Sequence, residues 1–395
     1  MRTNGGDKPR VVLLHNFMTP YRVPLFAELA RRFDFEVWIL GDVRAIREWP
    51  GEVPQDVFRW RLLPHVSIPT GSRDYRILLN LTLPHMLRRD LLGKSGRACD
   101  ALICCGWDTP AAFRSARWAR RVGMPFVLWS GSTAGEPNWR RRLSRPMVTK
   151  LVRGASSWIA YGTRAKDYLV SLGARGEHVF PAFNTVDLRP FERAAAMTES
   201  ERDTFQAGHG ISTRHMILYC GQLIERKGLS DLIPAFARVI ARGVDATLWI
   251  IGSGRGEAKY RGQAQRAGIA GRVRFEGFVA REDLPSYYAA ADLLALPSRQ
   301  EVWGLVINES LACGTPVLTT GAVGASPDLL KDGVNGYVVP PRDPERLAGA
   351  MLRHFADDGA RRAMRVAARN SIAPFTIARA ADAFERAVRV AVERR

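Results

Sequence analysis

The sequence contains little of what marks membrane-spanning, disulfide-stabilised or repetitive proteins. Five cysteines occur in 395 residues, and none pairs with a histidine at the spacing of metal ligands, so we expect reduced, buried thiols and no metal site. No apolar run approaches the roughly 18–20 residues that cross a bilayer, and the polar residues 1–10 hold no signal-peptide core. Low-complexity tracts and short repeats are also lacking. These absences favour a folded cytoplasmic protein.

Acidic residues are scarce relative to basic ones. The chain has 39 Asp and Glu against 58 Lys and Arg, a formal net charge of +19, and residues 1–190 contribute 30 basic and 16 acidic residues to this excess. The densest basic cluster is residues 139–145, followed by Lys150 and Arg153. Such a cluster docks on anionic lipid, binds an acidic substrate, or is simply a solvated face. Interleaved aromatic and basic residues of a nucleic-acid-binding module are lacking.

Short apolar runs alternate with segments of helical spacing along the whole chain. Repeated units of strand, loop and helix predict doubly wound sheets. Polar sequence at 187–211 interrupts the alternation and predicts two α/β, Rossmann-like domains, 1–190 and 191–375, facing each other across a cleft. Residues 376–395 predict a closing amphipathic helix, and its packing on the N-terminal domain is left open. The expected strands are 10–15, 35–40, 100–105, 125–129, 157–161, 178–183, 216–220, 246–251, 272–275, 292–296, 316–319 and 336–339.

The stretch 297–317 holds two acids, Glu301 and Glu309, where a strand is followed by a loop and a helix. Trp303 and Gly304 between them place Glu301 in the loop and Glu309 in the first turns of the helix. The N-terminus of a helix exposes N–H groups that attract phosphate, while carboxylates accept hydrogen bonds from hydroxyl groups. A sugar nucleotide offers both groups. The stretch is therefore a candidate sugar-nucleotide site, with an ordinary surface helix as the alternative.

A loop at 221–228 follows the first strand of the second domain. Lys227 in this loop is placed to reach a diphosphate oxygen, and Arg226 could share that task, because both side chains donate hydrogen bonds to phosphate. A lone Lys-Gly pair more often marks a simple turn. The position of the loop, at the carboxyl end of a strand, favours the binding interpretation.

The run 250–256 resembles a dinucleotide-binding fingerprint but has G-x-G-x-G spacing in place of G-x-G-x-x-G. Gly252 and Gly254 would permit close approach of the backbone to a nucleotide, although a plain turn is an equal alternative. A further loop, around Phe278, could offer backbone groups to a base. This last signal is weak.

The order of these motifs resembles the family-4 (group 1) retaining glycosyltransferases of GT-B fold. The pattern runs Gly-x-Leu-x-x-x-Lys-Gly, Gly-x-Gly, a Gly-Phe loop, and Ser-x-x-Glu-x-x-Gly-Leu-x-x-x-Glu-Ser-x-Ala-x-Gly-x-Pro-Val. It covers most of residues 205–345. The N-terminal half is similar more loosely, through residues 20–26, 161–168 and 183–187.

The resemblance implies a role for each matching position. Lys227 would bind the donor diphosphate, Glu301 the hydroxyls of the transferred sugar, and Glu309 the ribose hydroxyls. Such enzymes need no metal and no other cofactor, because cations and a helix N-terminus offset the charge on the leaving diphosphate. The donor-binding set would be Gln222, Arg226, Lys227, Gly252, Gly254, Phe278, Trp303, Gly304, Leu305, Val306 and Glu309.

Three features depart from the family pattern. Gln222 stands where the family usually has arginine, so one of two phosphate-binding cations is missing, and Arg226 or Arg299 is the candidate replacement. Trp303 takes the place of phenylalanine or tyrosine. The glycine-rich loop often found after the first strand is replaced by residues 16–21, which indicates a different acceptor.

The N-terminal domain usually binds the acceptor in this family. Many relatives place a polar residue of this domain above the donor sugar, and His15, Asn16 and Asp108 are the candidates. We prefer Asp108, although a helix N-cap role for Asp108 or Thr109 ahead of a proline is equally compatible with the sequence. The acceptor-side candidates are Asn16, Thr19, Tyr21 and Arg22.

We therefore expect a hexosyltransferase that moves a sugar, with retention and without metal, from a nucleoside-diphosphate donor such as a UDP- or GDP-sugar to an acceptor hydroxyl. The acceptor would be a glycan, a lipid-linked sugar or a small molecule. The expected catalytic residues are Glu301, Lys227 and Asp108. Front-face attack would make a carboxylate nucleophile unnecessary.

Two alternatives remain open at this point. A sugar-nucleotide epimerase or a phosphorylase would have the same architecture. From another class, the basic charge fits a protein that binds anionic surfaces or nucleic acid, although no specific nucleic-acid partner is indicated. The expected location is cytoplasmic, with peripheral contact of the basic N-terminal domain with the inner membrane face as an option.

Overall fold

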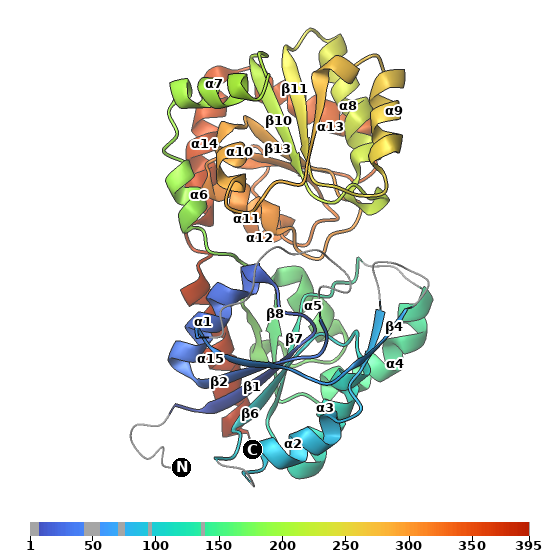
Figure 1. The fold of residues 1–395 in the computed structure, drawn as a ribbon, viewed down its shortest axis with the longest axis vertical. Coiled ribbons are helices and arrows are strands. Elements are labelled where there is room, and N and C mark those ends of the chain that lie inside the picture. Colours follow the sequence, from blue (N-terminus) through green and yellow to red (C-terminus); the bar gives the residue numbers. More distant parts are fainter. Residues whose placement is uncertain (1–7, 43–55, 70–75, 94–96, 136–138, 395) are drawn as a thin grey trace. The chain divides into compact units, whose positions relative to one another are not determined.

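The computed structural model describes residues 8–42, 56–69, 76–93, 97–135 and 139–394, with the backbone alone described for 139–142. The chain forms two compact units (Figure 1). Unit 1 consists of Met1–Val186 and Ile377–Arg395, and unit 2 is Asp187–Thr376. The C-terminal helix therefore belongs to unit 1, and unit 2 is inserted between two segments of that unit.

Unit 1 is built on a parallel sheet whose described strands have the order β3-β2-β1-β6-β7-β8-β9. β1 lies between β2 and β6, so the chain winds outward in both directions from the β1/β6 pair. The loops after these two strands diverge there, and this switch point is where such sheets bind ligands. The strands are β1 (Arg10–His15), β2 (Asp34–Ile39), β3 (Arg59–Leu62), β6 (Ala101–Cys105), β7 (Phe126–Ser130), β8 (Ser157–Ala160) and β9 (Val179–Pro181), beside the antiparallel pair β4 (Val66–Pro69) and β5 (Arg76–Leu79).

Helices cover both faces of this sheet. α1 and α15 share one core with the strands, and the ring of Phe384 in α15 meets that of Trp129 edge-on at 4.9 Å between centroids. The second core contains residues of α2, α3, α4 and α5. The helices of unit 1 are η1 (Pro20–Arg22), α1 (Val23–Arg32), α2 (Leu83–Leu91), α3 (Pro110–Val122), α4 (Trp139–Arg153), α5 (Thr163–Ser171), η3 (Gly176–His178) and α15 (Ile377–Glu393).

Unit 2 has a parallel sheet of order β12-β11-β10-β13-β14-β15, with its switch point between β10 and β13. Residues of α8, α9 and α13 share a core with one face of this sheet. The strands are β10 (His215–Cys220), β11 (Ala246–Ile251), β12 (Val273–Gly277), β13 (Leu293–Leu296), β14 (Val317–Thr320) and β15 (Gly336–Val339). The helices are α6 (Arg189–Ala194), α7 (Glu199–Gly208), η4 (Glu225–Lys227), α8 (Leu229–Ala241), α9 (Glu257–Arg266), η5 (Ala270–Arg272), α10 (Leu284–Ala290), α11 (Leu305–Ala312), α12 (Ser326–Leu329), α13 (Pro344–Phe355) and α14 (Asp358–Ile372).

The predicted parallel strands are all present, with boundaries shifted by at most two residues. β3, β4 and β5 were not predicted, because they have no continuous buried face and so lack a clear apolar alternation. The polar stretch 187–211 contains α6 and α7 rather than irregular chain. α7 begins with a capping box between Thr198 and Glu201, a signal that is readable in the sequence.

Candidate active site

The switch point of unit 2 brings the loop after β10 next to the loop after β13. The backbone N–H of Arg299 donates to the carbonyl of Arg226 at 2.8 Å, which joins the two loops directly. Gly228 has a φ of +80°, and a Cβ on it would lie 1.9 Å from the carbonyl oxygen of Pro297. Glycine is therefore needed here both for the left-handed backbone and for the close approach of the loops.

A cation and a carboxylate meet where these loops touch. Lys227 Nζ forms an ion pair with Glu301 Oε2, and both side chains are 14% exposed. The guanidinium of Arg226 lies 3.8 Å from the same carboxylate oxygen and is 43% exposed. Lys227 and Glu301, which the sequence analysis assigned to diphosphate and sugar, thus lie side by side with a second cation next to them.

Arg299 has a different environment from Arg226. Its Nε and Nη2 donate to the two carboxylate oxygens of Asp231 at 2.8 and 2.7 Å, and its Nη1 donates to Glu225. The hydrogen bonds to Asp231 raise the pKa of the guanidinium above its ordinary value. Because this side chain is held in internal ion pairs, it fixes the loop, and Arg226 is the arginine that presents its charge beside Glu301.

The N-terminus of α11 faces the same region. Gly304 precedes the helix with a φ of +95°, a left-handed conformation that favours glycine. Leu305 and Val306 follow as the first helical residues, whose N–H groups have no partner within the helix. Trp303 is buried, and its Nε1 donates to Asn308 Oδ1 at 3.0 Å. Its ring therefore anchors the turn that positions these N–H groups.

Glu309 lies on the inward side of α11 and is 9% exposed. Its Oε2 accepts a hydrogen bond of 2.7 Å from the hydroxyl of Tyr288, which is on α10. Burial raises the pKa of this carboxyl to about 7, against the lowering effect of the Tyr288 hydrogen bond. A carboxyl with this environment changes its charge near neutral pH.

The two glycines of the β11 loop serve backbone packing. A Cβ on Gly252 would lie 2.1 Å from the carbonyl oxygen of Gly221, and one on Gly254 would lie 2.8 Å from backbone atoms of Leu223. The loop is also joined to Leu223, whose N–H donates to the carbonyl of Ser253 at 3.0 Å. The glycines thus let the β11 loop support the β10 loop, and direct contact with a nucleotide stays a prediction.

Two other predicted donor residues lie near these loops. The carbonyl of Gln222 accepts a hydrogen bond of 2.9 Å from the hydroxyl of Tyr219, which fixes the backbone at that position. Phe278 follows β12 with an exposed ring. An exposed aromatic ring next to a ligand-binding edge is suited to stacking on a base.

In unit 1, the loop after β1 begins at the corresponding switch point. His15 is buried at the end of β1, and its Nδ1 is 2.7 Å from the carbonyl oxygen of Phe17. Burial and the charge of Arg22 lower the pKa of His15 to about 3, so this imidazole is neutral at physiological pH. Asn16 and Tyr21 are partly exposed, whereas Thr19 is buried.

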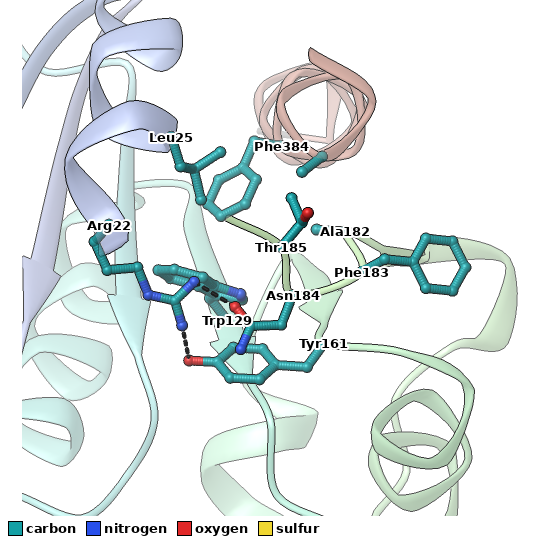
Figure 2. A pocket seen from close by; sticks show the side chains of 10 residues that line it. Arg22, Leu25, Trp129, Tyr161, Ala182, Phe183, Asn184, Thr185 and Phe384 are labelled. Atoms are coloured by element: carbon teal, nitrogen blue, oxygen red, sulfur yellow. Dashed lines mark hydrogen bonds between the residues drawn. The ribbon is translucent and has the colours of Figure 1, made fainter. Parts of the chain in front are cut away.

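Arg22 is 3% exposed and lies inside unit 1. Its Nη1 donates to Asn184 Oδ1 at 2.6 Å and its Nη2 to the hydroxyl of Tyr161 at 2.7 Å, as Figure 2 shows. The guanidinium lies 4.6 Å from the ring centroid of Trp129, a cation–π contact. Arg22 therefore joins the β1 loop to the chain after β9, and contact with an acceptor stays a prediction.

These side chains line a small pocket within unit 1 (Figure 2). Phe384 of α15 closes one side, and the chain from Ala182 to Thr185 runs along another. The pocket thus brings together the segment before Val186 and the helix that begins at Ile377, which are the two places where the chain leaves and re-enters the unit.

Asp108 is exposed in the loop after β6. The N-cap residue of α3 is Thr109, and its side chain makes no capping hydrogen bond. The helix begins at Pro110, as the sequence predicts. Asp108 belongs to unit 1, and its catalytic role stays a prediction.

Three residues of the site were missed by the sequence analysis: Tyr288, Asp231 and, in its structural role, Arg299. Tyr288 lies 21 positions before Glu309 and Asp231 lies 68 positions before Arg299, so no local spacing connects them. The signal that the sequence did hold is the presence of these polar side chains in the elements that build the core. A tyrosine or aspartate that is buried there needs a hydrogen-bond partner. Among the described residues, no group of three or more His, Cys, Asp or Glu side chains could hold a metal ion.

Comparison with protein families identifies the kind of domain that carries these loops. Residues 201–371 match the family described as glycosyl transferases group 1, and the match lies within unit 2. Unit 2 is a group 1 glycosyltransferase domain. The loops that carry Lys227 and Glu301 are both inside the matched region, as is Glu309.

Two curated relatives extend the comparison. The alpha-D-kanosaminyltransferase of Streptomyces kanamyceticus is 26% identical over 349 residues, which are 81% of this chain and 87% of that protein. The D-inositol 3-phosphate glycosyltransferase of Corynebacterium diphtheriae is 38% identical over 176 residues, 43% of this chain and 41% of that protein. The predicted resemblance to the group 1 glycosyltransferases is confirmed, and sugar transfer is the reaction class that these relatives share.

Solved structures confirm the fold. The crystal structure of Anabaena HepE in complex with UDP has a TM-score of 0.75 to this chain, at 20% identity, and the alignment covers 95% of this chain and 98% of that one. The structure of WaaG, a glycosyltransferase involved in lipopolysaccharide biosynthesis, has a TM-score of 0.68 at 19% identity, covering 94% and 97%. The chain therefore has the GT-B fold, as predicted.

Proposed function

We propose that this glycosyltransferase moves a sugar from a nucleoside-diphosphate sugar to an acceptor hydroxyl, with retention of configuration and without a metal. The observation that supports this most is the meeting of Lys227 and Arg226 with Glu301 beside the N-terminus of α11. Phosphate-binding and hydroxyl-binding groups are thereby combined in one place, as a sugar nucleotide requires.

Donor binding would redistribute the contacts of Lys227. The ammonium group has three donors, so it can turn toward a diphosphate oxygen and still remain close to Glu301. Arg226 and the N–H groups of Leu305 and Val306 would share the negative charge of the diphosphate. Glu301, partly released from its ion pair, would then accept hydrogen bonds from hydroxyls of the transferred sugar, and Glu309 would bind the ribose.

The proposed reaction is substitution at the anomeric carbon. The bond between this carbon and the diphosphate oxygen breaks, and its electron pair leaves with the diphosphate, while the acceptor oxygen forms the new bond on the same face. The acceptor proton passes to the departing phosphate oxygen. The cations and the N-terminus of α11 stabilise the charge that develops on the leaving group. Glu301 is engaged by Lys227, which fits a binding role better than that of a nucleophile.

A binding panel of UDP-, GDP-, ADP- and TDP-sugars tests the donor assignment. The Lys227→Met variant should lose binding about 10- to 100-fold, because a charge-assisted contact to phosphate contributes about 1.5–3 kcal/mol. Lys259→Met is the matched control, since this exposed lysine pairs with Glu225 rather than with Glu301. If the folded protein binds no member of the panel, the proposal is wrong.

Product analysis tests the reaction class. Glu301→Gln should retain the fold and reduce sugar transfer strongly, while the control Glu257→Gln removes a partly exposed carboxylate that pairs with Arg261 on α9. Nuclear magnetic resonance of the product would show whether the anomeric configuration is kept. Release of an epimerised sugar nucleotide without acceptor, or of a sugar phosphate when phosphate is added, would favour the epimerase or phosphorylase alternative.

We also propose peripheral contact of α4 with anionic membranes from the cytoplasmic side. Leu143 and Met147 of this helix are 72% and 55% exposed, and Arg145 and Lys150 are exposed near them. Exposed apolar side chains next to basic ones suit a helix that lies on an anionic bilayer. Three further arginines of the predicted cluster, at 140–142, have side chains outside the described residues. Among the described helices, none is both long and apolar enough to cross a membrane.

Co-sedimentation with vesicles tests this contact. The protein should be recovered with vesicles that contain anionic lipid and not with neutral ones, and a Leu143→Glu, Met147→Glu double variant should lose the difference. Val366→Glu is the control, because Val366 is an exposed apolar residue of α14 in unit 2. Equal recovery with neutral and anionic vesicles would contradict the proposal.

A further inference from the structure

Tyr288 is held rigidly behind the carboxylate of Glu309. The tyrosine is completely buried on α10, and its hydroxyl donates to Glu309 Oε2 at 2.7 Å. Its backbone carbonyl accepts a hydrogen bond of 2.6 Å from Thr315 Oγ1, and its ring meets that of Phe191 at 5.9 Å between centroids. These contacts hold the ring in place and keep the hydroxyl beside Glu309, with the Cys220 thiol as its other polar neighbour. The Tyr288 hydroxyl is therefore a preorganised donor to Glu309.

Few charged groups act on Glu309 from the surrounding elements. Cys220, at the end of β10, and Cys313, after α11, are buried thiols. Burial raises the pKa of Cys220 to about 12 and that of Cys313 well above its ordinary value, so both are neutral. Arg281, before α10, is the cation that acts on the carboxylate. On α14, Arg365 donates to the carbonyl oxygens of Ala289 and Ala291. The tyrosine hydroxyl is thus the direct hydrogen-bond donor to this carboxylate.

We propose that Tyr288 is a positioning residue for the nucleotide: its hydroxyl occupies one oxygen of Glu309, fixes the carboxylate plane, and leaves the other oxygen to accept the ribose hydroxyls. The proposal rests on the proposed function, in which Glu309 binds the ribose. It adds Tyr288, a residue of another helix, to the recognition of the nucleotide. The preference for ribose over deoxyribose depends on this residue.

This arrangement has a consequence for pH. The ionised carboxylate accepts hydrogen bonds on both oxygens, from Tyr288 and from ribose hydroxyls, and accepts them more strongly than the protonated acid, in which one oxygen carries a hydrogen. A hydrogen bond to the charged form favours that form, whereas burial disfavours it. Removing the Tyr288 hydroxyl therefore shifts ionisation of Glu309 to higher pH. Nucleotide affinity in the variant should follow this shift.

Calorimetric titration of UDP and GDP, each in its ribose and 2′-deoxyribose form, tests the proposal between pH 6 and pH 9. The wild-type protein should bind its preferred ribonucleotide about tenfold more weakly at pH 6 than at pH 8, as a group with a pKa near 7 loses its charge. In Tyr288→Phe the same decline should begin about one pH unit higher, with about fivefold weaker binding at pH 7 and recovery at pH 9.

Two control variants identify the groups involved. Tyr287→Phe removes a neighbouring hydroxyl that faces His209, and it should keep the wild-type pH profile. Glu309→Gln should bind weakly and almost independently of pH. Tyr288→Phe should also reduce the preference for ribose over 2′-deoxyribose.

The outcomes separate the two levels of the argument. A Tyr288→Phe protein with the wild-type pH profile would overturn the positioning role while leaving the nucleotide site intact. A uniform loss of affinity at all pH values, together with a lower melting temperature, would show a merely structural role and also overturn it. If the folded wild-type protein binds neither nucleotide, the proposed function fails, and this inference fails with it.

Discussion

The two arginines near the candidate diphosphate site should respond in opposite ways to replacement by methionine. Arg226 is 43% exposed and makes its closest ionic contact at 3.8 Å from Glu301, so its loss removes little from the free protein. In the donor complex it would contribute one partly solvated contact to the diphosphate. Such a contact is worth about 1–1.5 kcal/mol, so Arg226→Met should weaken donor binding about tenfold and leave the melting temperature almost unchanged.

Arg299→Met should instead destabilise unit 2. Arg299 makes a two-point ion pair with Asp231, whose side chain is 9% exposed, and the variant would leave this carboxylate buried without its partner. Breaking such a pair costs about 3 kcal/mol, which corresponds to a fall of about 6–12 °C in the melting temperature of a domain of this size. Donor affinity, measured where the variant is still folded, should fall less than in Arg226→Met.

Differential scanning calorimetry and nucleotide titration on the same samples would distinguish these outcomes. A double variant, Arg299→Met with Asp231→Leu, is the matched control, because removing both charges should restore much of the stability. If Arg226→Met lowers the melting temperature while Arg299→Met abolishes binding at full stability, the two assignments are reversed. Gln222→Arg should strengthen donor binding, since it would add the cation that the family usually has there.

Three further predictions concern stability and loop geometry. Although burial opposes its ionisation, the neighbouring His215 and a hydrogen bond of 2.9 Å from Arg202 hold the pKa of Asp292 well below its usual range, so this contribution to stability is complete above about pH 5 and is lost as the pH falls. Urea denaturation should therefore show Asp292→Asn less stable than wild type by about 3 kcal/mol at pH 7, with a smaller difference at pH 3; an equal difference at both would contradict the assignment. Gly228→Ala should abolish donor binding, because its Cβ would collide with a backbone carbonyl 1.9 Å away; unchanged binding would show that the loop contact is dispensable. Phe384→Ala should destabilise unit 1 by about 3–5 kcal/mol. If the calorimetric transition of unit 2 keeps its wild-type temperature, the effect is local to unit 1.

Local pattern was sufficient for the parallel strands and for the loops that carry Lys227 and Glu301. Buried parallel strands are short apolar runs, and such runs are visible in the sequence whatever packs on them. Lys227, Glu301 and Glu309 lie in motifs whose order along the chain is itself informative. The strand order then brings the loops after β10 and β13 together, so their proximity follows from the topology.

The side-chain networks could not be predicted in this way. Arg22 and Asn184 are 162 positions apart, and their hydrogen bond depends on how two loops of a finished sheet approach each other. The internal hydrogen bonds of Arg22 were therefore not predicted, and its acceptor-side role stays a prediction. The choice between Arg226 and Arg299 was open for a similar reason, because only packing shows that Arg299 is already paired with Asp231.

The position of α15 has a consequence for the synthesis of the protein. One face of the unit 1 sheet is covered by α15, whose Ala381, Phe384 and Ala387 are fully buried there, although it is separated from the rest of the unit by all of unit 2. A ribosome makes residues 187–376 before it makes this helix. Unit 2 is continuous and can complete its fold first, while the first sheet still exposes an apolar face. The N-terminal unit is thus the last to be completed, and a nascent chain interrupted before residue 377 would have an uncovered sheet as its most aggregation-prone surface.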